Sequence, residues 1–318
     1  VSARSSWDED ATYFFFTCGA RFTAHQHLDV GNFLIYKHEE LVGDGGHYDS
    51  FGTPHDVNYH LRTLAHNTVL VRDPSGTWPG IRAGTVTAND GGQHHNWPHH
   101  NGAVVDPAQW QKERALYDIA DLLAFEDRGD YLYVAGDCTR AYSPKKLARF
   151  TRQIVFLRPG TFVVFDQVKS TNAAFKKTWL LQAMKPPTGT APNLTLANGK
   201  GRLFVQTLLP HDPAVRLATG ADLYSYDGKS YPPQRDTGPA PECRIEISPP
   251  QPAETDYFLH VLTATDADVA SVPQATVRES AGEITVALGE TRLTFRTDAV
   301  GGRIERGGRS ATLATSVP

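Results

Sequence analysis

Short apolar segments, separated by turn-forming residues, recur along the whole length of the chain. Each is rich in β-branched and aromatic residues and is bounded by Gly, Pro, Asn or Asp, a pattern that predicts β-strands. The sequences RPGT at 158–161 and ALGET at 287–291 predict tight hairpin turns. We find no helical stripe longer than a few turns, so the pattern predicts an all-β fold, a large antiparallel β-sandwich of stacked sheets. The predicted strands are residues 12–18, 32–36, 67–71, 121–127, 131–137, 152–157, 161–168, 176–182, 202–209, 243–248, 257–262, 283–288 and 291–297.

Two clusters of Pro and Gly interrupt this pattern, at 185–195 and at 232–241. Each is compatible with a loop that crosses between sheets or with an internal boundary, and we favour loops. We therefore interpret residues 1–318 as one sandwich unit.

Composition narrows the classes of function. Hydrophobic residues make up 40% of the chain and charged residues 21%, which predicts a globular protein with a substantial core. A net charge of -4 argues against nucleic acid as a partner, but leaves room for an acidic sugar in a local basic patch. No apolar run is long enough to cross a bilayer, so we expect no membrane partner. The cysteines Cys18, Cys138 and Cys243 form no CxxC pair; one disulfide at most is possible, and buried free thiols are expected.

The segment AHQHLD at 24–29 carries the most suggestive polar pattern. If it is extended, His25, His27 and Asp29 project from the same side. Asp44 follows a short apolar run and precedes two glycines, and His66 precedes another predicted strand. Three adjacent segments could therefore bring histidine and aspartate side chains together.

Imidazole nitrogen and carboxylate oxygen are good donors for zinc, which commonly takes three protein ligands. Asp29 could then accept a hydrogen bond from a ligand imidazole and fix its tautomer. From the residues alone, ordinary hydrogen-bonded structural histidines remain an equal alternative. Residues 89–102 form a polar loop rich in histidine, in which Trp97 could stack on a sugar ring.

The stretch AHQHLDVGNFLIYKHEELVGDGGHY, followed by LRTLAHNTVLV, resembles the heparinase II/III-like family of polysaccharide lyases, and the heparinase II branch most closely. The likeness continues through NDGGQ, YLYVAGDCTRAYSPKK and RFTRQIVFLRPGTFVVFDQV. Enzymes of this family join an N-terminal α/α toroid to a C-terminal antiparallel β-sandwich, and only the sandwich is found in this chain. The resemblance implies that His27, Asp44 and His66 bind a mainly structural zinc ion. It also implies that His25 faces the sugar and takes part in catalysis.

The implied reaction is β-elimination at a 4-linked uronic acid, with heparin or heparan sulfate as substrate and alginate or another uronate polymer as a rival. Tyr48 and Tyr59 flank the motifs and are candidate sugar contacts or proton donors, and Arg62 is a candidate partner for a sugar acid. A toroid domain or chain would complete the active site. The resemblance implies a periplasmic or secreted protein; no signal pattern is present, and we expect the native N-terminus to lie upstream of Val1.

Two other classes of function remain open. One is a metal-stabilised carbohydrate-binding or scaffold module without catalysis. The other is a zinc hydrolase that uses a metal-bound water.

Overall fold

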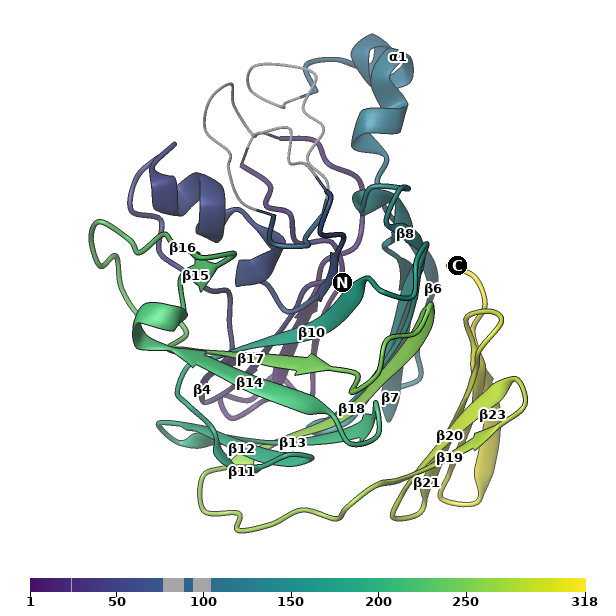
Figure 1. Cartoon of the computed structure of the whole chain (residues 1–318). Helices are drawn as coiled ribbons and strands as arrows, with labels where there is room; N and C mark the ends of the chain where they lie inside the picture. Colours follow the sequence, from purple (N-terminus) through teal and green to yellow (C-terminus); the bar gives the residue numbers. More distant parts are fainter. Residues whose placement is uncertain (24, 77–88, 94–103) are drawn as a thin grey trace.

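The computed structural model describes residues 1–23, 25–76, 89–93 and 104–318 and consists mainly of antiparallel strands in stacked sheets (Figure 1). The first sheet has the order β1-β2-β3-β4-β10-β17-β14, with β5 paired to β10. Its strands are β1 (Ser2–Arg4), β2 (Tyr13–Phe16), β3 (Phe33–Lys37), β4 (Glu39–Val42), β5 (Val69–Arg72), β10 (Lys176–Ala183), β14 (Ala214–Thr219) and β17 (Cys243–Ser248).

The second sheet has the order β11-β12-β13-β18-β9-β8-β7-β6. Its strands are β6 (Asp121–Asp127), β7 (Tyr131–Asp137), β8 (Leu147–Leu157), β9 (Thr161–Ser170), β11 (Thr188–Thr190), β12 (Asn193–Asn198), β13 (Gly201–Leu209) and β18 (Thr255–Asp266).

The C-terminal sheet is a meander in which each strand pairs with the next one in the chain, and it covers the second sheet (Figure 1). It contains β19 (Thr276–Ser280), β20 (Glu283–Leu288), β21 (Thr291–Arg296), β22 (Gly302–Arg306) and β23 (Arg309–Leu313). A separate two-stranded ribbon joins β15 (Ser225–Tyr226) to β16 (Lys229–Ser230). The helical elements are α1 (Pro107–Tyr117) and the short turns η1 (Asp56–His60), η2 (Thr63–Ala65), η3 (Thr139–Ala141) and η4 (Gly220–Asp222).

The central strands of the second sheet, such as β9, are buried on both faces. Successive residues of a strand point to opposite faces, so Phe162 and Val164 of β9 pack toward the first sheet, while Val163 and Phe165 pack toward the C-terminal sheet. This arrangement explains why β9 contains the unbroken apolar run FVVF at 162–165, where an ordinary half-exposed strand would alternate. The stack of three layers confirms the predicted all-β fold.

Every predicted strand is present, and both predicted hairpin turns join paired strands, β8 to β9 and β20 to β21. The segment 185–195 runs from β10 in the first sheet to β12 in the second and includes β11, while 232–241 is the loop that leads into β17. The helix α1 was not predicted from the sequence, although it begins with a recognisable signal: the Asp106 carboxylate accepts from the Gln109 backbone N–H at 2.8 Å, and Pro107 follows. Among the described residues, no helix has the length and apolar character needed to cross a membrane.

Candidate functional site

The segment that carries His25 and His27 is a loop, and the extended conformation considered for it is not found. We call residues 17–32, between β2 and β3, the histidine loop. The Gln26 side chain folds back to accept from the Thr23 N–H at 3.0 Å and to donate to the Ala20 carbonyl at 3.2 Å. The Arg21 guanidinium donates to the carbonyls of Gln26 and His27, both at 2.9 Å. These local side-chain bonds satisfy backbone groups that a strand would pair in a ladder.

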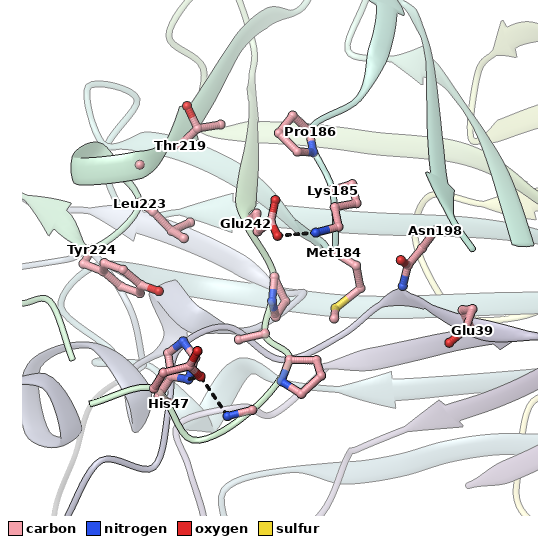
Figure 2. A pocket seen from close by; sticks show the side chains of 16 residues that line it. Glu39, His47, Met184, Lys185, Pro186, Asn198, Thr219, Leu223, Tyr224 and Glu242 are labelled. Atoms are coloured by element: carbon pink, nitrogen blue, oxygen red, sulfur yellow. Dashed lines mark hydrogen bonds and ion pairs between the residues drawn. The ribbon is translucent and has the colours of Figure 1, made fainter. Parts of the chain in front are cut away.

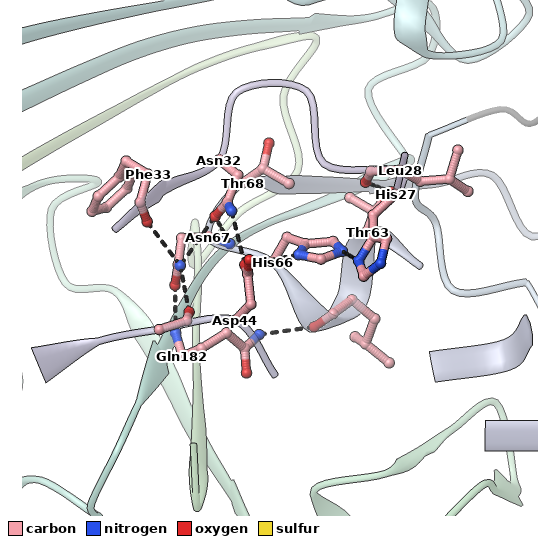
Figure 3. Close-up of polar contacts among 12 residues, drawn as sticks. His27, Leu28, Asn32, Phe33, Asp44, Thr63, His66, Asn67, Thr68 and Gln182 are labelled. Carbon is pink, nitrogen blue, oxygen red and sulfur yellow. Dashed lines mark hydrogen bonds and ion pairs between the residues drawn. The ribbon is translucent and has the colours of Figure 1, made fainter. Parts of the chain in front are cut away.

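His27, His66 and Asp44 lie in a row (Figure 3). His27 Nδ1 is 3.3 Å from His66 Nε2, and His66 Nδ1 is 2.9 Å from Asp44 Oδ1. The same carboxylate oxygen accepts from Asn32 Nδ2 at 2.8 Å. The structure therefore brings together the three residues predicted as metal ligands, with Asp44 and His27 on different nitrogens of His66.

A buried amide holds this row in place (Figure 3). Asn67, next to His66, donates from Nδ2 to the carbonyls of Phe33 at 2.9 Å and Gly43 at 2.8 Å, and to Asn32 Oδ1 at 3.1 Å. Its Oδ1 accepts from the Gln182 N–H at 2.6 Å. One side chain thus connects β3, the end of β4 and β10 beneath His66 and Asp44.

The donor atoms fit zinc in part. Two nitrogens that lie about 2.0–2.1 Å from a tetrahedral zinc are about 3.3–3.4 Å apart, which matches the separation of His27 Nδ1 and His66 Nε2. Asp44 occupies the position of a carboxylate that orients a ligand histidine, the role that the sequence suggested for Asp29. Within the residues that the structure describes, no group of three His, Cys, Asp or Glu side chains is arranged to hold a metal ion.

Burial and mutual proximity control the charges of these groups. Burial, followed by the neighbouring His66 and His60, holds the pKa of His27 far below its usual range, so that this imidazole is neutral near pH 7. Burial also lowers the pKa of His60 to about 4, with a further contribution from His66. For His66 itself, burial is the largest influence and acts to lower the pKa, but the Asp44 carboxylate, joined by Asp29 and the His60 backbone, raises it, and the net shift is upward. Burial raises the pKa of the Asp29 carboxyl to about 6.

A pocket of about 260 Å³ opens beside this row. His25 is exposed at the pocket and packs against Phe51, with 6.0 Å between ring centroids. Tyr48 is half-exposed, and its ring lies 6.1 Å from that of His60. The pocket is lined by His25, His27, Tyr48, Phe51, Asp56, His60 and Leu61. His60, Phe51 and Asp56 were not among the residues predicted from the sequence. The sequence DVNYHL places His60 six residues before His66, which is the one signal that pointed to it.

Two other predicted site residues do not line this pocket. Tyr59 is fully buried, and its hydroxyl accepts from Arg244 Nη1 at 3.4 Å. Arg62 is fully buried in an ion pair with Asp90, at 2.7 Å. Direct contact of either side chain with a polymer conflicts with this burial, so the structure argues for packing roles. Trp97 lies outside the described residues.

A larger pocket of about 920 Å³ lies beside the first sheet (Figure 2). Glu39, Asp236 and Glu242 outnumber Lys185 on its walls, and Lys185 is paired with Glu242. Among its described lining residues, none was predicted as a site residue. A surplus of carboxylates repels an acidic polymer, so the histidine pocket is the better candidate site despite its smaller volume.

Fold and site together define a layered antiparallel β domain with a histidine-lined pocket. Residues 3–307 match the family described as Heparinase II/III-like, C-terminal. The chain belongs to this family, which confirms the family resemblance seen in the sequence. No curated protein matches the sequence.

Solved structures share the fold. A heparinase III has a TM-score of 0.64 at 14% identity, and the match covers 93% of this chain and 40% of that one. A heparan sulfate lyase HepC from Pedobacter heparinus has a TM-score of 0.58 at 14% identity, with 99% and 41% covered. The chain therefore spans about 40% of the length of these proteins. Assignment to the heparinase II branch stays a prediction.

Proposed function

We propose that this chain is the β-sandwich part of a polysaccharide lyase that cleaves a uronic-acid-containing acidic polysaccharide by β-elimination. The observation that carries the proposal is the pocket that presents His25 and Tyr48 to solvent in a member of the Heparinase II/III-like, C-terminal family. Within this class we propose heparin or heparan sulfate as the substrate, as in the heparinase II branch. A periplasmic or secreted location is part of the proposal and rests on the resemblance alone.

The proposed reaction needs three functions at one uronate residue. Its carboxylate must be neutralised, the C5 proton must be removed, and the departing O4 must receive a proton as the C4–O4 bond breaks and the C4–C5 double bond forms. An exposed imidazole such as His25 can donate to the carboxylate or accept the C5 proton near neutral pH. Tyr48, at the same pocket, can donate to the leaving oxygen. A toroid domain or chain, as in the family, would supply the remaining groups.

We also propose that His27 and His66 hold a zinc ion, with Asp44 accepting the hydrogen bond of His66 Nδ1. The 3.3 Å separation of the two imidazole nitrogens and the neutral state of His27 support this. When bound, zinc would supply a fixed positive charge that fastens the histidine loop to the segment that precedes β5.

The activity is tested in the full-length protein with heparan sulfate and alginate, by following the ultraviolet absorbance of the unsaturated product. We expect His25→Ala to lower kcat/KM by about 10²–10⁴-fold, the usual range for loss of a general acid or base. His211→Ala is the matched control. His211 is an exposed histidine in the loop between β13 and β14, and it pairs with Glu279 of β19. Binding without any rise in absorbance would support the carbohydrate-binding module instead. Cleavage without an unsaturated product would support the hydrolase.

The zinc proposal has its own test, which does not depend on activity. Metal analysis of the purified protein should give about one zinc per chain, and His27→Ala should abolish binding. Asp44→Asn should weaken zinc affinity by about 10–100-fold without abolishing it, as expected for a residue that orients a ligand. Complete loss in Asp44→Asn would instead make Asp44 a ligand, and absence of zinc from the wild type would refute the site.

A further inference from the structure

Two of the three cysteines meet in the structure, although 120 positions separate them in the sequence. Cys18 follows β2 at the beginning of the histidine loop, and Cys138 follows β7 of the second sheet. Cys18 packs against the buried core cluster that contains Cys138, and the Cys18 thiol raises the pKa of the Cys138 thiol. The Cys18 thiol also lies 4.0 Å from the carbonyl oxygen of Asp137, the residue bonded directly to Cys138. Both are free thiols here.

The surrounding residues leave space for this contact. A Cβ placed on Gly136 would lie 2.5 Å from the Cys18 sulfur, so the absence of a side chain at Gly136 creates the space that Cys18 fills. On the other side, a Cβ on Gly31 would lie 3.1 Å from the Cys138 sulfur. Gly31 has a φ of +87°, a conformation that favours glycine. Two glycines therefore border the pair.

We propose that Cys18 and Cys138 are a disulfide site, closed by a thiol–disulfide oxidant such as oxidised glutathione or the disulfide of an oxidoreductase. The bond would tie the start of the histidine loop to the second sheet across the main core. It would close a loop of about 120 residues, and a crosslink over such a long loop strongly restricts the unfolded chain.

The accessibilities of the two thiols set the order of steps. Cys18 is partly exposed and Cys138 is fully buried, so Cys18 meets the oxidant first. The Cys18 thiolate attacks one sulfur of the oxidant, forming a mixed disulfide and releasing one thiol. Cys138 then loses its proton and attacks the Cys18 sulfur, which releases the second thiol. The protein loses two protons and two electrons, and the oxidant disulfide becomes two thiols. The Cys18 thiol and burial both raise the pKa of Cys138, which makes this second step the slow one.

The test uses the whole chain treated with oxidised glutathione, unfolded in the presence of an alkylating agent and mapped by mass spectrometry. We expect one linked peptide pair that joins Cys18 to Cys138, with only Cys243 alkylated. Cys243 is the internal control, since it is buried in β17. The melting temperature should rise by roughly 5 °C on oxidation and return to its starting value when dithiothreitol is added.

Two variants separate this site from other thiol chemistry. Cys18→Ala should lose the redox dependence of the melting temperature, whereas Cys243→Ala should keep it. Three alkylated cysteines after oxidation, a bond that includes Cys243, or dimers linked through Cys18 would each overturn the proposal. The mapping of the wild type decides the question even if a variant fails to fold.

Discussion

Asn67 offers the sharpest test of how the fold positions the candidate site. Its side chain is fully buried and makes four hydrogen bonds, three from Nδ2 and one to Oδ1. In Asn67→Ala, the carbonyls of Phe33 and Gly43 and the N–H of Gln182 each lose a partner. A buried polar group left without its partner costs about 1–3 kcal/mol. We take the lower half of this range for three such groups, which predicts a loss of about 3–6 kcal/mol in the free energy of unfolding.

Urea denaturation followed by tryptophan fluorescence measures this loss, as a fall in the midpoint at an unchanged slope. Asn198→Ala is the matched control, because the partly exposed Asn198 makes a single side-chain bond, to the Glu40 carbonyl at 2.9 Å. We expect the control to lose about 1 kcal/mol or less. Asn67→Asp should be at least as damaging as Asn67→Ala, since its second oxygen faces two carbonyl oxygens. If the free energy of unfolding lost in Asn67→Ala were within about 1 kcal/mol of that lost in Asn198→Ala, the buried amide of Asn67 would not hold the site in place.

Two further predictions concern the core. Burial lowers the pKa of His260 to about 3, so below about pH 6.5 the unfolded chain binds a proton at this residue that the folded chain does not bind. The free energy of unfolding should therefore be highest above pH 6.5 and fall by at most about 5 kcal/mol toward pH 3. In His260→Gln, unfolding measured across this pH range should show a smaller fall. Gly160→Ala should lower the urea midpoint markedly, because the new Cβ would lie 2.4 Å from the Ala264 carbonyl oxygen. Gly19→Ala is the control and should change the midpoint little, because its Cβ would meet nothing within 4 Å. Equal effects of the two substitutions would contradict the steric argument.

Much of the fold could be predicted because its strands are individually clear. The segments at 121–127 and 161–168 are bounded by turn residues and contain β-branched or aromatic side chains, so local pattern was enough. Pairing was not predictable in the same way. β10 lies between β4 and β17 and also pairs with β5, and such contacts between distant segments leave no periodic signal in the chain. Short edge strands such as β1 and β11 carry too few residues to show a pattern.

The candidate site was predictable by residue type more than by geometry. His27, Asp44 and His66 do come together, as their sequence context indicated. Their order within the row depends on which nitrogen of His66 faces which neighbour, and sequence carries no information on that. The burial of Tyr59 and Arg62 was hidden for a related reason, because both are polar residues whose partners, Arg244 and Asp90, come from distant parts of the chain.

The position of the C-terminal sheet has a consequence for synthesis of the protein. The second sheet can pair all its strands once β18 has left the ribosome, but its outer face, with Val163, Phe165 and Leu259, is covered only by strands made afterwards. Until residues 276–313 emerge and fold as a local meander, the growing chain presents a broad apolar surface to the cell. If translation stalled within residues 276–313, the released chain would be a nearly complete sandwich with one exposed apolar face. Chaperones bind and proteases degrade species of this kind.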